Sequence, residues 1–248
     1  MKAYWRLPLA GAAAYLLILL ITLPADRAVK LLEQNTVGLD LQSVSGTLFS
    51  GKAERVVIRG LGMGPVTWSL RPLPLLLARL EYRFDLQDPA FRGKGVVGAG
   101  LGGHVYFHDL KAELKPDPLV NHFSPLPVQT SGDMRLLIES MDFVDGFPQD
   151  LSGHVDWTDA RIVEPMVMSL GHVEATLHSE ANTLVCHLSG VGETSLSGDF
   201  SLTQQGDYRL NLLLTPGTEV SSDIVDGLKT VGQARPGGAY QITDSGRL

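Results

Sequence analysis

The amino-acid sequence predicts a mainly β protein: an elongated, curled antiparallel sheet of two related halves, preceded by one N-terminal transmembrane helix. Three observations support this fold class. A run without charged residues follows a basic N-terminus, apolar and polar residues alternate beyond residue 36, and turn-forming residues interrupt that alternation at hairpin spacing. Alternation with a period of two gives a strand one apolar and one polar face, and turns every ~8–12 residues are typical of antiparallel hairpins.

The N-terminal segment predicts the membrane topology. Lys2 and Arg6 lie in residues 1–6, and residues 7–23 carry no charge. As a helix this run would be about 26 Å long at ~1.5 Å per residue, close to the ~30 Å hydrocarbon layer. Basic residues before a span stay in the cytoplasm. We therefore expect a cytoplasmic tail at 1–6, an anchor at 7–23 and the rest of the chain outside.

A cleaved signal peptide is the alternative to this anchor. Cleavage needs small residues at the −3 and −1 positions. Cleavage after Ala25 would put Leu23 at −3, and cleavage after Ala28 would put Asp26 there. Both are poor sites, so we expect an uncleaved anchor. Residues 24–35, in which apolar residues recur at helical spacing, are expected to continue as a juxtamembrane helix.

Beyond residue 36 the alternation predicts strands in two β halves, 36–118 and 128–248, joined by a proline-rich connection at 119–127. Residues 64–68 and 153–157 share the pattern Gly-x-Val-x-Trp, which suggests that the halves are related; chance similarity of short strands is the alternative. The clearest alternating strands lie at 37–42, 82–87, 105–108, 173–178 and 208–214.

Two segments predict short helices. Residues 223–231 predict one such helix, with Ser222 or Asp223 as its cap. Residues 72–80 start with prolines and are apolar on nearly every side. This second segment must be buried as a plug at one end of the sheet, or lie against lipid or a partner. Its candidate interaction residues are Leu73, Leu75, Leu76, Leu77 and Leu80.

Two tryptophans are further candidates for an interaction site. Trp68 and Trp157 close the two Gly-x-Val-x-Trp patterns and either pack in the core or line a ligand groove. Cys186, the single cysteine, can form no internal disulfide, and its alternating apolar surroundings indicate a small core residue.

Composition and motifs argue against enzymatic and nucleic-acid-binding functions. The net charge of −7 gives no field that attracts nucleic acid. Residues 93–98 match G-x-G-x-x-G, but a glycine-rich stretch follows where a dinucleotide site needs a helix. Neither a G-x-S-x-G elbow nor an H-E-x-x-H or H-x-H spacing is present. We therefore predict no catalytic residues, no cofactor and no metal.

The order of several short motifs resembles the general secretion pathway protein N family, the N component of bacterial type II secretion systems. Residues 45–53 read S-G-T-L-F-S-G-K-A, with Phe49 where the family more often has Trp, and residues 68–76 read W-S-L-R-P-L-P-L-L. Residues 151–157 and 206–210 complete the pattern, which spans most of the chain.

This resemblance implies a non-enzymatic inner-membrane protein that faces the periplasm. It would act as an accessory interaction or assembly protein in the export of folded proteins across the outer membrane, with other components of the machinery as partners. The β domain is also similar to the AsmA-like group, whose members form a long curled sheet with an apolar trough. That similarity implies an alternative, a lipid-binding or lipid-transfer protein that takes up phospholipid.

Overall fold

The computed structural model describes residues 24–26, 38–58, 60–100, 102–117, 129–164, 167–218 and 220–247. These residues are mostly in antiparallel strands, which confirms the mainly β fold class. The predicted segments 1–6, 7–23 and 119–127, and most of 24–35, lie outside the described residues. Among the helices that are described, none has the length and apolar character of a membrane span.

The chain divides into two compact units, Met1–Pro89 and Ala90–Leu248. This boundary differs from that of the two expected halves, 36–118 and 128–248, because the strands between residues 90 and 118 belong to the second unit. The kinship of the two halves and the curled, elongated outline stay predictions.

In its described part, the first unit contains two antiparallel sheets. The smaller sheet has the order β1-β4-β5, and the larger runs β2-β3-β6-β7. Alternation along β7 is as predicted, because Tyr82, Phe84 and Leu86 are half-buried and the residues between them are exposed. The strands are β1 (Leu39–Gln42), β2 (Ser45–Gly46), β3 (Ser50–Ala53), β4 (Arg55–Ile58), β5 (Leu61–Met63), β6 (Val66–Arg71) and β7 (Leu80–Gln87).

The helix expected at 72–80 forms, but it is shorter than predicted. Helix α3 covers Pro72–Leu75 and is followed by a turn. Ala78 has a positive φ of 54°. The amide of Arg79 donates to the Pro74 carbonyl at 3.0 Å, and that of Ala78 donates to the Leu75 carbonyl at 3.0 Å. This pattern is a Schellman motif, which ends a helix by satisfying its last carbonyls.

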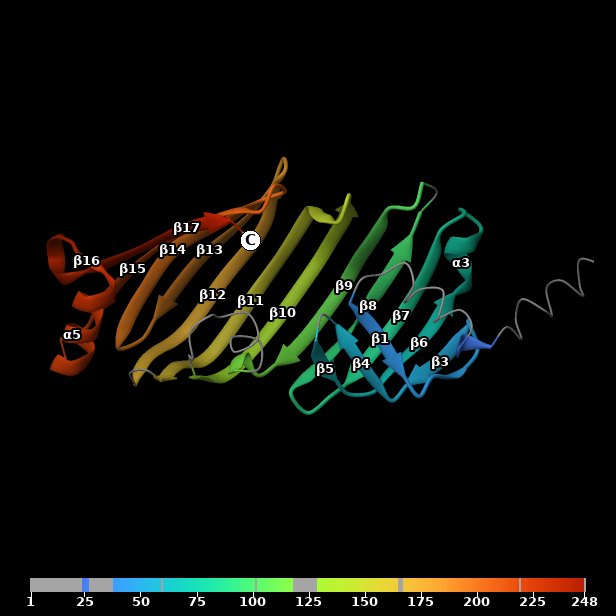
Figure 1. Cartoon of the computed structure of the whole chain (residues 1–248), viewed down its shortest axis with the longest axis horizontal. Coiled ribbons are helices and arrows are strands. Elements are labelled where there is room, and N and C mark those ends of the chain that lie inside the picture. Colours follow the sequence, from blue (N-terminus) through green and yellow to red (C-terminus); the bar gives the residue numbers. More distant parts are fainter. Residues whose placement is uncertain are drawn as a thin grey trace, which may run out of the picture. The chain divides into compact units, whose positions relative to one another are not determined.

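The second unit is a meander in which each strand from β8 to β15 pairs with the next along the chain (Figure 1). Strand β17 pairs with β15, and β16 lies at the edge. The residues of the G-x-G-x-x-G match lie in β8, and the glycine-rich stretch that follows leads into β9 of a β8–β9 hairpin rather than into a helix. The strands are β8 (Phe91–Ala99), β9 (Val105–Leu114), β10 (Gln129–Val144), β11 (Phe147–Glu164), β12 (Met168–Glu180), β13 (Thr183–Val191), β14 (Thr194–Thr203), β15 (Asp207–Pro216), β16 (Gln233–Ala234) and β17 (Tyr240–Arg247).

Helix α5, Ser222–Val231, confirms the predicted helix at 223–231 and covers one end of this sheet (Figure 1). Its N-cap is Ser221, so the prediction of Ser222 or Asp223 as the cap is wrong. Its buried residues Ile224 and Leu228 are four apart, so both point to the same side of the helix. They pack into the main hydrophobic core of the unit. The other buried residues of this core are Ala160, Met168, Leu170, Val173, Leu196, Leu214 and Tyr240.

Away from α5 the two faces of the second sheet differ in chemistry. Strand register places Leu136, Val155, Leu188 and Leu212 in one cross-strand row on the same face as the core. These residues are half-buried rather than buried. The opposite face is polar and carries most of the imidazoles and carboxylates of β11 to β14. The sheet therefore has one apolar face that α5 covers only in part.

Candidate interaction surface

The candidate interaction surface is a group of leucines on and after α3, here called the leucine patch: Leu73, Leu75, Leu76, Leu77 and Leu80. Their exposed fractions are 76%, 42%, 83%, 71% and 42%. Fully burying one leucine contributes about 1.5–3 kcal/mol, so leaving five of them in water forgoes considerable stabilisation. Contiguous exposed apolar residues typically mark a surface that binds a membrane or another protein.

Strands β6 and β7 hold the leucine patch at their connected ends. The register pairs Arg71, the last residue of β6, with Glu81 of β7. The Arg71 guanidinium donates to a Glu81 carboxylate oxygen at 2.8 Å, and the Glu81 side chain is 8% exposed. The Arg71 side chain is 38% exposed, but the burial of the Glu81 carboxylate strengthens this pair relative to one between two exposed side chains. Together with the Schellman turn, this ion pair fixes the short connection that presents the leucines.

In the described structure these leucines face solvent instead of forming the plug that the sequence also allowed. A plug would require them to be buried like Ala53 or Val56, which are 0% and 6% exposed in the same unit. Whether the leucine patch binds lipid or protein stays a prediction.

Trp68 lies near the leucine patch in the chain and lines an open hollow of about 450 Å³ in the first unit. Gly51 is opposite Trp68 on β3, and Phe84 is opposite it on β7. A Cβ added at Gly51 would lie 2.4 Å from the indole ring, so the glycine makes room for it. Trp68 is half-buried, which fits a packing role beside the hollow.

Trp157 belongs to the second unit, whereas Trp68 belongs to the first. Its indole N–H donates to the Ser131 carbonyl at 3.0 Å, and its ring packs against the hydrophobic core. The hydrogen bond therefore joins β11 to β10, and the ring packs β11 against the core. Of the two roles that the sequence allowed, the structure favours core packing for Trp157.

The single cysteine, Cys186, is buried in β13. Burial, with the charge of Asp199 as the smaller cause, raises the pKa of the Cys186 thiol. The thiol therefore stays protonated and unreactive, as the sequence indicated.

On the polar face of the second sheet, His154, Asp156 and Glu174 form a group with ligand atoms close enough to share a metal ion.

Sequence reasoning missed the residues that support the leucine patch. Arg71 and Glu81 lie ten positions apart, and only strand register makes them partners. Gly51 was noticed as part of a motif, but its relation to Trp68 could not be read from spacing because the two residues lie on different strands.

The fold and surface define a class of protein: a module of antiparallel sheets with an exposed apolar patch suited to association. The comparisons with known proteins give the family. The model of the family "Type II secretion system (T2SS), protein N" matches residues 37–243, which is most of the chain. The chain therefore belongs to the type II secretion system protein N family.

Curated relatives agree with this assignment. The type II secretion system protein N of Vibrio cholerae serotype O1 is 28% identical over 218 residues, covering 85% of this chain and 86% of the relative. The protein of the same name from Aeromonas hydrophila is 28% identical over 244 residues, with 95% of each chain covered. That of Pectobacterium carotovorum subsp. carotovorum is 25% identical over 218 residues, with 85% of each covered. No solved structure matches the chain significantly.

Proposed function

We propose that this protein is a non-enzymatic accessory component of a type II secretion system, anchored in the inner membrane by residues 7–23, with its β units in the periplasm. It would use the leucine patch to dock onto another membrane component of the machinery and assist assembly for the export of folded proteins. The observation that carries this proposal is the exposure of Leu73, Leu76 and Leu77 on a connection fixed by the Arg71–Glu81 ion pair.

The chemistry of the leucine patch favours an apolar partner. Asp, Glu and Lys are absent from residues 72–79, and Arg79 is the charged residue of the connection. A transmembrane helix of a neighbouring subunit, or the part of it that leaves the bilayer, offers a matching apolar surface. Burying the exposed leucines of the leucine patch against such a surface would provide the driving force for association. Association of this kind requires no catalytic group.

Crosslinking in intact cells tests the docking surface. A photo-reactive amino acid is placed at position 76 of the full-length protein, and in a control at position 87, an exposed residue at the other end of β7. We expect adducts with a secretion component from position 76 and few or none from position 87. Equal yields from both positions, or adducts with unrelated proteins only, would contradict the proposal.

The membrane topology has its own test. A reporter that is active only in the periplasm, fused after Leu248, should be active, because Lys2 and Arg6 retain the N-terminus in the cytoplasm. The fusion should also keep its full length on a gel. Activity of a cytoplasmic reporter at the same position would contradict the orientation, and loss of roughly 25 residues would indicate a cleaved signal peptide.

A lipid-binding function is the second candidate, and the half-buried apolar row of the second sheet favours it. Leu136, Val155, Leu188 and Leu212 lie in one cross-strand row on one face of β10, β11, β13 and β15. Ala175 of β12 and Gly198 of β14 complete the row, which offers a surface that acyl chains could cover. Phospholipid retained in stoichiometric amount by the purified protein, and lost on Leu188→Asp, would support this function. Lipid recovered equally from both proteins would indicate carry-over from the membrane.

A further inference from the structure

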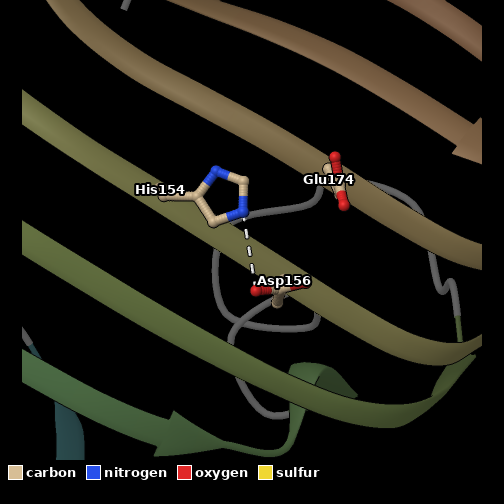
Figure 2. A group of neighbouring side chains, drawn as sticks. All are labelled: His154, Asp156 and Glu174. Atoms are coloured by element: carbon tan, nitrogen blue, oxygen red, sulfur yellow. Dashed lines mark ion pairs between the residues drawn. The ribbon is translucent and has the colours of Figure 1, made fainter.

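The polar face of the second sheet carries a cluster of two imidazoles and two carboxylates that the proposed function does not use: His154 and Asp156 of β11, and His172 and Glu174 of β12. In each strand the two residues are two positions apart and so point to the same face. Register pairs Asp156 directly with Glu174 across the strands. Figure 2 shows His154, Asp156 and Glu174 converging from the two neighbouring strands.

Several distances within this cluster are close to those between ligands of a single ion, although His172 lies outside the group of three whose ligand atoms are all close to one another. Nε2 of His154 lies 3.5 Å from Oδ2 of Asp156. Nε2 of His172 lies 3.2 Å from Oδ1 of Asp156 and 3.1 Å from Oε1 of Glu174. In a tetrahedral zinc site with bonds of ~2.0–2.2 Å, neighbouring ligand atoms are about 3.3–3.5 Å apart. The observed separations therefore bracket the edges of such a site.

The ligand atoms of His154, Asp156 and Glu174 all lie within 4.8 Å of one another. This is wider than a tetrahedron edge, so the side chains must rotate inward to hold one ion. His154 and Glu174 are partly exposed, with side-chain exposures of 40% and 52%, and have room for this rotation. The strands below them are central ones, because β10 and β13 pair with them on either side, so the backbone positions are fixed.

Electrostatics also point to a cation. Two carboxylates directly opposite each other on neighbouring strands repel, and such pairs destabilise a sheet. Arg135, which is opposite Asp156 on β10, brings one positive charge to this part of the sheet, against the two negative charges of the carboxylates. A divalent cation between the carboxylates would neutralise both and use the neutral imidazoles as ligands.

We propose that His154, Asp156, His172 and Glu174 form a site for a divalent transition-metal cation of the Zn²⁺ class, which would bridge β11 and β12. Imidazole nitrogens select Zn²⁺, Ni²⁺, Cu²⁺ or Co²⁺ over Ca²⁺ and Mg²⁺, which prefer oxygen ligands. Local motif searches do not find this site, because its two pairs of ligands are sixteen or more residues apart and only the β11–β12 register joins them.

Calorimetric titration with Zn²⁺ tests the site. The full-length protein, purified in a mild detergent without a polyhistidine tag and stripped with a chelator, should bind one Zn²⁺ per chain. His154→Ala combined with His172→Ala should abolish binding, and Glu174→Gln, which keeps the size of the side chain, should weaken it at least about tenfold. Excess Ca²⁺ or Mg²⁺ should not compete.

His108→Ala is the matched control, because His108 is also a surface histidine of the second unit, 2.9 Å from the carboxylate of Asp109. This variant should bind Zn²⁺ like the unaltered protein. Absence of stoichiometric binding by the unaltered protein, equal affinity in Glu174→Gln, or an equal loss in His108→Ala would overturn the proposal. A Zn²⁺-dependent rise in melting temperature that the double variant lacks would support it independently.

Discussion

Replacing Leu76 by aspartate separates a docking surface from a buried plug. Leu76 is 83% exposed, so about a sixth of its surface is buried. A sixth of the ~1.5–3 kcal/mol for full burial of a leucine is about 0.3–0.5 kcal/mol. At roughly 2–4 °C per kcal/mol for a chain of this size, we expect the melting temperature to fall by about 1–2 °C.

The same substitution should have a large effect on association. If a partner buries Leu76 fully, losing ~1.5–3 kcal/mol weakens the complex roughly 10- to 150-fold, before the cost of desolvating the carboxylate is added. The assays are thermal unfolding of the full-length protein in detergent and co-purification of its partners from crosslinked cells.

Val56→Asp provides the matched control for stability, because Val56 is buried in the same unit at 6% exposure. An unpaired carboxylate there should cost more than about 3 kcal/mol and unfold the unit. If Leu76→Asp lowered the melting temperature as much as Val56→Asp does, the leucine patch would be a structural plug. Unchanged stability together with unchanged co-purification would reject the docking role.

Three further predictions concern packing and reactivity. Gly51→Ala should destabilise the protein by about 1–3 kcal/mol, because the added Cβ would meet the Trp68 ring at 2.4 Å. Gly62→Ala should be tolerated, because a Cβ there would meet no atom within 4 Å, and denaturant titration compares the two variants. Thr194 is fully buried, and its hydroxyl has no hydrogen-bond partner among the described residues. Thr194→Val should therefore raise the free energy of unfolding by about 1 kcal/mol, and a loss of stability would refute this. Because burial raises the pKa of the Cys186 thiol, this thiol should react with a maleimide far more slowly in the native than in the denatured protein. Mass spectrometry measures the labelling, and rapid labelling of the native protein would contradict the burial of Cys186.

Local patterns were sufficient to predict five of the strands (β1, β7, β9, β12 and β15) and the helix expected at 223–231. The strand from 207 to 216 alternates as the sequence indicated, with Leu210 and Leu212 half-buried and the residues between them exposed. The period of two is a property of one strand, so it is readable from the sequence without knowledge of its neighbours. Ile224 and Leu228 are readable for the same reason, because a helix alone sets their common face.

Features that depend on pairing between strands were not predictable. The Arg71–Glu81 ion pair and the His154–Asp156–His172–Glu174 cluster arise from strand register, which spacing along the chain does not specify. The length of α3 was also overestimated. Residues 76–80 favour a helix by composition, but Ala78 adopts a left-handed conformation that ends it after Leu75.

A secretion assay tests the central claim most directly. In cells that lack the chromosomal gene, variants are expressed at equal level, and the fraction of a type II-secreted enzyme in the medium is measured. Leu76→Asp should leave the enzyme in the cells, while Gln87→Asp, an exposed polar position of the same unit, should restore secretion. Full secretion by Leu76→Asp would contradict the docking role of the leucine patch, and full secretion without any copy of the gene would contradict a role in export.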